Sequence, residues 1–225
     1  MERWLRNSSI TRPISQSNRT SKKNTDICIN NKSSIVVTAK TLEYYSKEEY
    51  ITRAMESTVK LEYHDGLIVE AMAGGTSEHS KIKTDTLVFL AGNTKKCQTF
   101  DSNMAVKIEA HNRYVYPDMS FVCGEDTYED DRRIFLLNPS LIIEVLSPKT
   151  KDIDRGEKFM WYRSIPSFKE YVLIQSESMN VESWYKEEEN LWRIQPADKL
   201  AQSIRLFTLD IDLPLEEIYK RVHSS

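Results

Sequence analysis

Apolar residues first recur at regular spacing near Leu42, and the segment before it, rich in Ser, Asn, Thr, Lys and Arg, shows almost none. Residues 1–41 are therefore expected to form a flexible arm, and residues 42–225 a single domain. The first element of that domain is predicted by Ser46-Lys-Glu-Glu49, a capping box. It indicates a helix that runs from Ser46 to about Glu56.

A β-hairpin and a second helix are predicted next. Lys60–His64 and Leu67–Met72 flank Asp65-Gly66, the dipeptide that suits a two-residue hairpin turn. Ser77 has the chemistry of a helix N-cap, and the apolar positions after it predict a helix over Glu78–Ala91.

The rest of the chain alternates between β-like runs and helical segments. The expected strands are Cys97–Phe100, Met104–Glu109, Tyr116–Cys123, Leu141–Ser147, Phe168–Gln175, Val181–Lys186 and Leu191–Ile194, the last two as a hairpin. The expected helices are Asp154–Ser164 and a closing helix over Leu215–Val222. This order predicts an α/β (α+β) fold, with a mixed β-sheet flanked by helices.

Composition limits the classes of function. The chain has 225 residues, 40% of them hydrophobic, which suffices for a sizeable core. Residues 1–42 carry a net charge of +6, so the remainder carries −9 of the total of −3. An acidic body is not typical of a protein that coats DNA nonspecifically. The basic arm is either a dispensable tail or an arm that binds DNA or a partner.

The cysteines and the apolar runs indicate the compartment. Cys28, Cys97 and Cys123 are odd in number and lack CxxC spacing, which favours reduced thiols over a disulfide framework or a zinc knuckle. No run of 18 apolar residues predicts a membrane span, and no secretory leader is evident. A cytoplasmic protein is expected.

Two acidic residues stand inside otherwise apolar strands. Glu144 interrupts Leu141-Ile-Ile-Glu-Val-Leu146, and Asp118 follows Pro117 at the start of another such run. A buried carboxylate needs a cation, a proton or a hydrogen-bonding partner. If the two strands are neighbours, the carboxylates converge and favour Mg²⁺ or Mn²⁺. A structural ion pair is the alternative for Glu144.

Lys158 is the third residue of interest. It lies on the helix predicted after the Glu144 strand, from which an ammonium could reach the carboxylates and stabilise a transition state. The alternative is an exposed lysine that pairs with Asp154 at i,i+4.

These residues together resemble a known family. Pro117-Asp118, Glu144-Val-Leu-Ser-Pro148, Asp154-Arg-Gly-Glu-Lys158 and Tyr162 are similar to the motifs of the PD-(D/E)XK nuclease superfamily, and more narrowly to its Uma-type family of restriction-endonuclease-like proteins. The likeness covers roughly residues 42–225. It implies a restriction-endonuclease-like core with an added N-terminal hairpin and a C-terminal β-hairpin.

The resemblance also implies the residues of the site. Asp118, Glu144 and the main-chain carbonyl of Val145 would bind the metal, with Glu62 and His79 as further catalytic candidates. The superfamily places its lysine on the Glu144 strand at the position of Leu146. In the Uma-type family that role passes to the next helix, which is Lys158 here.

Two functions follow from the sequence. The first is a Mg²⁺-dependent (or Mn²⁺-dependent) endonuclease that cleaves DNA. The alternative is a catalytically inactive module that keeps the fold and binds nucleic acid or protein, because fold alone does not decide function. A homodimer that uses the Tyr171–Arg193 hairpin region is a further expectation.

Overall fold

Caps and tight turns divide the chain close to the predicted places. The computed structural model describes residues 43–71, 75–148 and 151–222. Ser46 caps helix α1 (Lys47–Glu56) through both hydrogen bonds of the capping box. Strands β1 (Leu61–His64) and β2 (Leu67–Glu70) form the predicted hairpin, with positive φ angles at Asp65 and Gly66.

The first sheet contains this hairpin. Among the described residues it has five strands in the order β2-β1-β5-β4-β7. The additional strands are β4 (Ala105–Ile108), β5 (Arg113–Val115) and β7 (Phe135–Leu136), with a 3-10 turn, η1 (Glu109–His111), between β4 and β5. Helix α1 packs on this sheet through Tyr50, which is fully buried beside Tyr63 and Tyr114.

The second sheet holds the core of the fold. In the described part of the chain it has six strands in the order β11-β10-β9-β8-β6-β3, with β8 and β9 parallel and the other pairs antiparallel. Their bounds are β3 (Cys97–Asp101), β6 (Met119–Cys123), β8 (Leu141–Leu146), β9 (Glu170–Gln175), β10 (Val181–Glu188) and β11 (Leu191–Ala197). The mixed sheet and the C-terminal hairpin β10–β11 are confirmed.

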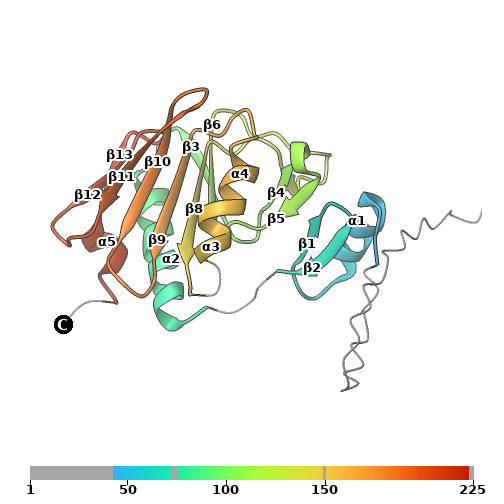
Figure 1. Cartoon of the computed structure of the whole chain (residues 1–225), viewed down its shortest axis with the longest axis horizontal. Helices are drawn as coiled ribbons and strands as arrows, with labels where there is room; N and C mark the ends of the chain where they lie inside the picture. The colour runs from blue at the N-terminus through green and yellow to red at the C-terminus, as the bar shows by residue number, and fades with distance from the viewer. Residues whose placement is uncertain (1–42, 72–74, 149–150, 223–225) are drawn as a thin grey trace, which may run out of the picture. The chain divides into compact units, whose positions relative to one another are not determined.

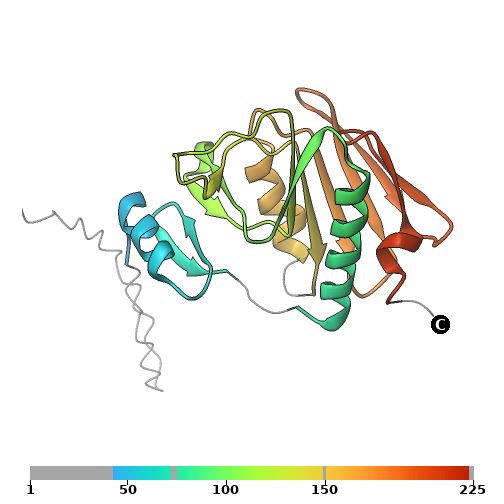
Figure 2. The ribbon, with the colours of Figure 1, turned by 180° about the vertical axis from the view of Figure 1, so that it is seen from behind.

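Helices cover both faces of the second sheet. Figure 1 shows α3 (Lys151–Ile153) and α4 (Phe159–Tyr162), joined by the π-helical turn η2 (Asp154–Lys158), on one face. Figure 2 shows α2 (Ser77–Asn93) and α5 (Leu215–Tyr219) on the other. Because side chains alternate along a strand, Ile143 faces α2 and α5, whereas Ile142 faces α4. The α/β class is therefore confirmed.

Several boundaries differ from the prediction. The run Tyr116–Cys123 is not one strand, since β5 ends at Val115 in the first sheet and β6 begins at Met119 in the second. Pro117 lies between them and cannot donate a ladder hydrogen bond. The hairpin of β12 (Ser203–Leu206) and β13 (Ile211–Pro214) was not predicted.

The prediction of reduced cysteines is wrong for one pair. Cys97 and Cys123 form a disulfide. They stand directly opposite each other in the antiparallel pair β3–β6, and this register cannot be read from cysteine spacing.

The prediction for the N-terminal arm is not tested by the described residues, and the prediction for membrane spans is tested only within them. The basic arm of residues 1–41 falls outside them, so its structure and its boundary with the domain stay predictions. None of the helices in the described ranges is long and apolar enough to cross a membrane.

Candidate metal and active site

Asp118 and Glu144 lie on neighbouring strands, where their side chains meet. Asp118 directly precedes β6, and the register pairs Met119 with Ile143 of β8. The main-chain N–H of Asp118 donates to Glu144 Oε2 at 3.2 Å. In return, the N–H of Val145 donates to Asp118 Oδ2 at 2.9 Å. Each carboxylate is thus oriented by the backbone of the other strand.

Glu144 is buried against the segment η2–α4. It is only 3% exposed. The Lys158 ammonium and the Tyr162 hydroxyl both donate to Glu144 Oε1 at 3.0 Å. Lys158 also lies 2.7 Å from Asp154 Oδ1, so its charge is shared between two buried carboxylates.

The π-helical turn places Asp154 and Lys158 in this cluster. Turns of this kind inside α-helices are frequent at functional sites. Lys158 was predicted either to reach the carboxylates or to pair with Asp154, and the structure shows both contacts. The hydroxyl of Tyr171 on β9 donates to the Asp154 carbonyl at 3.0 Å and fixes the start of this turn to the sheet.

Asp118 is held from the other side by α2. His79 Nε2 lies 3.4 Å from Asp118 Oδ2, and Lys83 Nζ lies 3.6 Å from Asp118 Oδ1. These two residues are four positions apart and therefore share one face of the helix. Gly75 leaves room for the imidazole, because a Cβ at Gly75 would come within 2.6 Å of His79 Nδ1.

The surroundings set the charges of the cluster. Burial raises the pKa of Glu144 to about 8, against the opposing effect of Lys158. Burial acts in the same direction on Asp118, but the hydrogen bonds from His79 and the Val145 N–H outweigh it and lower the pKa of Asp118. For Lys158, burial is outweighed by Glu144 and Asp154, which raise its pKa and keep it cationic.

Glu62 lies near the Asp118–Glu144 pair without a hydrogen bond to either carboxylate in the described residues, and its charge helps to raise the pKa of Tyr162, the donor to Glu144. Glu62 Oε1 accepts from the Tyr116 N–H at 3.0 Å, and its Oε2 lies 2.9 Å from His64 Nε2. In the described part of the chain its hydrogen bonds go to these two residues, and not to Asp118 or Glu144. The observed role of Glu62 is to join β1 to the segment after β5.

The donor set fits a hard divalent cation. Mg²⁺ is commonly bound through one or two carboxylates together with water, and Asp118 and Glu144 supply such a pair. Since the Val145 N–H points to Asp118, the carbonyl of the same extended residue points to that side of the strand as well. Among the described residues, no group of three or more His, Cys, Asp or Glu side chains could hold a metal ion.

Sequence reasoning missed two contacts. Lys83 could have been found, because it follows His79 by one helical turn. Asp154 was considered only as a partner of Lys158, and its 2% exposure could not be predicted, because it depends on how η2 packs against the sheet.

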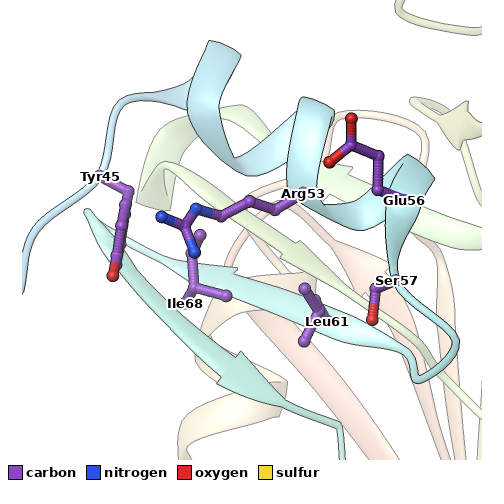
Figure 3. Close-up of a pocket in the computed structure, with 6 residues that line it drawn as sticks. All are labelled: Tyr45, Arg53, Glu56, Ser57, Leu61 and Ile68. Atoms are coloured by element: carbon purple, nitrogen blue, oxygen red, sulfur yellow. The ribbon is translucent and has the colours of Figure 1, made fainter.

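A separate surface hollow lies between α1 and the β1–β2 hairpin. Figure 3 shows its lining, in which Arg53 stacks over the Tyr45 ring at 4.4 Å. None of the predicted site residues lines this hollow, so it is distinct from the carboxylate cluster.

The fold and the paired acids define a restriction-endonuclease-like class of protein, and comparisons with known proteins agree. The Uma2 family, described as "Putative restriction endonuclease", matches residues 47–216. The chain belongs to this family, as predicted.

Relatives and a solved structure extend the comparison. The chain is 31% identical over 180 residues to the uncharacterized protein slr1290 of Synechocystis sp., covering 78% of this chain and 91% of the relative. It is 32% identical over 160 residues to sll1609 of the same organism, covering 70% and 88%. A crystal structure of a "putative nuclease belonging to DUF820" from Anabaena variabilis has the same fold, with a TM-score of 0.62 at 15% identity, covering 77% of this chain and 96% of that one.

Proposed function

We propose that the protein is a PD-(D/E)XK-type endonuclease that hydrolyses phosphodiester bonds in DNA with Mg²⁺ or Mn²⁺. The observation that carries the proposal is the convergence of Asp118, Glu144 and Lys158 from β6, β8 and η2. Membership of a family described as putative restriction endonucleases supports it.

The metal ligands would be Asp118, Glu144 and the Val145 carbonyl. When bound, the cation would supply electrostatic stabilisation of the phosphate oxygens. The protein's own contribution is orientation. Val145 N–H and His79 hold the Asp118 carboxylate, while Tyr162 holds Glu144.

Lys158 supplies the positive charge of the site. Its ammonium is held in place by Glu144 and Asp154. These two carboxylates raise the pKa of Lys158, so it stays protonated at neutral pH. A fixed cation stabilises the negative charge that develops on the phosphate in the transition state. The Lys158 side chain as a whole is 18% exposed.

The test is nicking of supercoiled plasmid with Mg²⁺ or Mn²⁺ and with EDTA. Asp118→Asn and Glu144→Gln should each lower the rate at least about a hundredfold, because each removes a carboxyl group that would hold the metal and so weakens the stabilisation of the transition state. Asp198→Asn, at an exposed position beyond β11, is the matched control and should leave the rate unchanged. Equal rates in all four proteins, or cleavage in EDTA, would contradict the proposal.

A binding module without catalysis is the second candidate. One observation favours it: each oxygen of the Asp118 and Glu144 carboxylates already has a partner within the protein. Such a cluster is balanced in charge without a metal. Calorimetric titration with Mn²⁺ separates the two, since a nuclease should bind Mn²⁺ and lose that binding in Asp118→Asn. A module of this kind should show no Mn²⁺ binding and no nicking.

Three further expectations remain predictions. They are the cytoplasmic location, the homodimer through the Tyr171–Arg193 region, and a role for the basic arm in binding DNA. Deleting residues 1–41 should flatten the salt dependence of DNA binding if the arm contacts phosphates.

A further inference from the structure

Two lysines from separate elements converge on one serine beside Asp118. Lys60 directly precedes β1, Lys83 lies within α2, and Ser102 follows β3. Lys60 Nζ lies 2.5 Å from the Ser102 carbonyl oxygen and 3.4 Å from Ser102 Oγ. Lys83 Nζ lies 3.4 Å from the same Oγ. The two ammonium groups are therefore neighbours around a single hydroxyl.

This arrangement brings two like charges together. Like charges repel at short range, and both ammonium groups are partly removed from water. Burial, together with the nearby Lys83 charge, lowers the pKa of Lys60. A structural role for either lysine would not require the other, so the pairing itself needs an explanation.

Two carboxylates, Asp101 and Asp118, lie near the pair and raise the pKa of Lys60 against the effect of burial. The hydrogen bonds of Lys60 go to the neutral groups of Ser102, and its ammonium lies 5.6 Å from the Tyr116 ring. Asp101 also accepts two hydrogen bonds from Asn103, which is neutral and leaves the charge of the carboxylate in place. Lys83 Nζ lies 3.6 Å from Asp118 Oδ1, and Asp118 is the carboxylate proposed to bind the metal. When Asp118 binds the metal as proposed, its charge offsets less of the lysine charge, and that positive charge becomes available to an anion.

We infer that Lys60, Lys83 and the Ser102 hydroxyl form a phosphate-binding site that holds the DNA backbone next to the Asp118–Glu144 pair. Lysine binds phosphate as a point charge, and a hydroxyl between two ammonium groups adds a hydrogen-bond donor. The 3.6 Å contact between Lys83 and Asp118 places such a phosphate beside the carboxylates. The inference rests on the proposed nuclease function, and it assigns to Lys60 and Lys83 the positioning of the substrate.

The experiment measures binding, so it does not depend on catalysis. Fluorescence anisotropy of a labelled DNA duplex is recorded over a range of salt concentrations, in EDTA and again in Ca²⁺. Each phosphate contact contributes about 0.9 to the slope of log K against log salt for duplex DNA. Lys60→Gln and Lys83→Gln should each reduce that slope by about 0.9, and the double variant by about 1.8.

Controls separate phosphate binding from a structural role. Lys199→Gln removes an exposed lysine between β11 and β12 and should leave the slope unchanged. Lys60→Arg and Lys83→Arg keep the charge and should retain the wild-type slope. Ser102→Asp keeps both lysines but puts a carboxylate where the phosphate would lie, so it should weaken binding as much as the double variant does. Circular dichroism checks that each variant is folded.

The outcomes distinguish this inference from the proposed function. Slopes unchanged in both glutamine variants would overturn the phosphate site, even if the wild type nicks plasmid. A wild type that binds with lysine-dependent slopes but never nicks would support the phosphate site and contradict the nuclease. A wild type that does not bind DNA under either condition would overturn the phosphate site.

Discussion

The Lys158 ammonium lies 3.0 Å from Glu144 Oε1, although the two residues are separated by 14 positions and belong to different elements. The superfamily pattern would put a lysine at Leu146, on the same strand as Glu144. Leu146 is instead buried in the core under α4. The positive charge beside Glu144 comes instead from Lys158 in η2.

Lys158→Met should nearly abolish plasmid nicking. Loss of a group that stabilises transition-state charge typically costs about 2.7–4 kcal/mol, roughly a hundred- to thousandfold in rate. The variant should also be less stable by about 3–5 kcal/mol, because Glu144 and Asp154 then share no cation. The nicking rate is therefore measured together with the folded fraction from urea unfolding.

A matched control and a rescue complete this test. Lys151→Met, at an exposed position in α3, should keep the wild-type rate. Adding Leu146→Lys to Lys158→Met should restore part of the activity, since Leu146 and Glu144 face the same side of β8. A full wild-type rate in Lys158→Met would refute a catalytic role for this lysine.

Tyr162→Phe should weaken both the site and the fold. The hydroxyl donates to Glu144 Oε1 at 3.0 Å in a fully buried position. Removing one hydrogen-bonding partner of a buried polar group costs about 1–3 kcal/mol, so the free energy of unfolding should fall by that amount and nicking should slow. Tyr50→Phe is the control, because Tyr50 is also fully buried but donates to the Leu61 carbonyl. It should lose stability without a change in nicking rate.

The sequence predicted the structural features that depend on neighbouring residues alone. The capping box at Ser46 and the turn at Asp65-Gly66 each involve only neighbouring residues, and both formed as expected. The convergence of Asp118 and Glu144 was inferred from two interrupted apolar strands and from the family resemblance. Their roles in metal binding and catalysis remain predictions.

The features that the sequence did not predict depend on packing and on the register of the strands. The turn η2 brings Asp154 into contact with Lys158 within the core, and no periodicity signals such a turn. The contact of Glu62 with Tyr116 depends on the pairing of β1 with β5, which the sequence does not show, and the catalytic role of Glu62 remains a prediction. Lys60 and Lys83 meet at Ser102 because three distant segments come together.

Glu170 should make stability depend on pH. It is fully buried at the start of β9 and accepts hydrogen bonds from Ser183 and from the N–H groups of Phe207 and Thr208. Burial raises its pKa above 4.5, against the effect of these hydrogen bonds. A carboxyl whose pKa is raised on folding contributes most stability below its unfolded pKa, and loses that contribution as pH rises through the folded pKa.

Comparison with Glu170→Gln measures this contribution. The amide cannot accept at both of its ends, so one buried donor is left unsatisfied, at a cost of about 1–3 kcal/mol. The advantage of the wild type over Glu170→Gln should be smaller at about pH 7 than at about pH 4.3, the ordinary pKa of Glu, because the raised pKa makes ionisation cost more in the folded state. Urea unfolding at both values checks this, with Glu188→Gln, an exposed position on β10, as the control. An advantage that grows with pH would contradict the assignment.

The disulfide between Cys97 and Cys123 should stabilise the edge of the second sheet. It joins residues separated by 26 positions, and the chain-entropy model gives about 3.5 kcal/mol for a loop of that length. The disulfide links the edge strand β3 to β6, and β6 begins beside Asp118. Its loss should therefore loosen β3 more than it disturbs the site. Urea unfolding with and without dithiothreitol measures the difference, and Cys97→Ser/Cys123→Ser should be insensitive to the reductant. A purified wild-type protein in which all three thiols react with Ellman's reagent would show that the pair stays reduced, as the cysteine count first indicated.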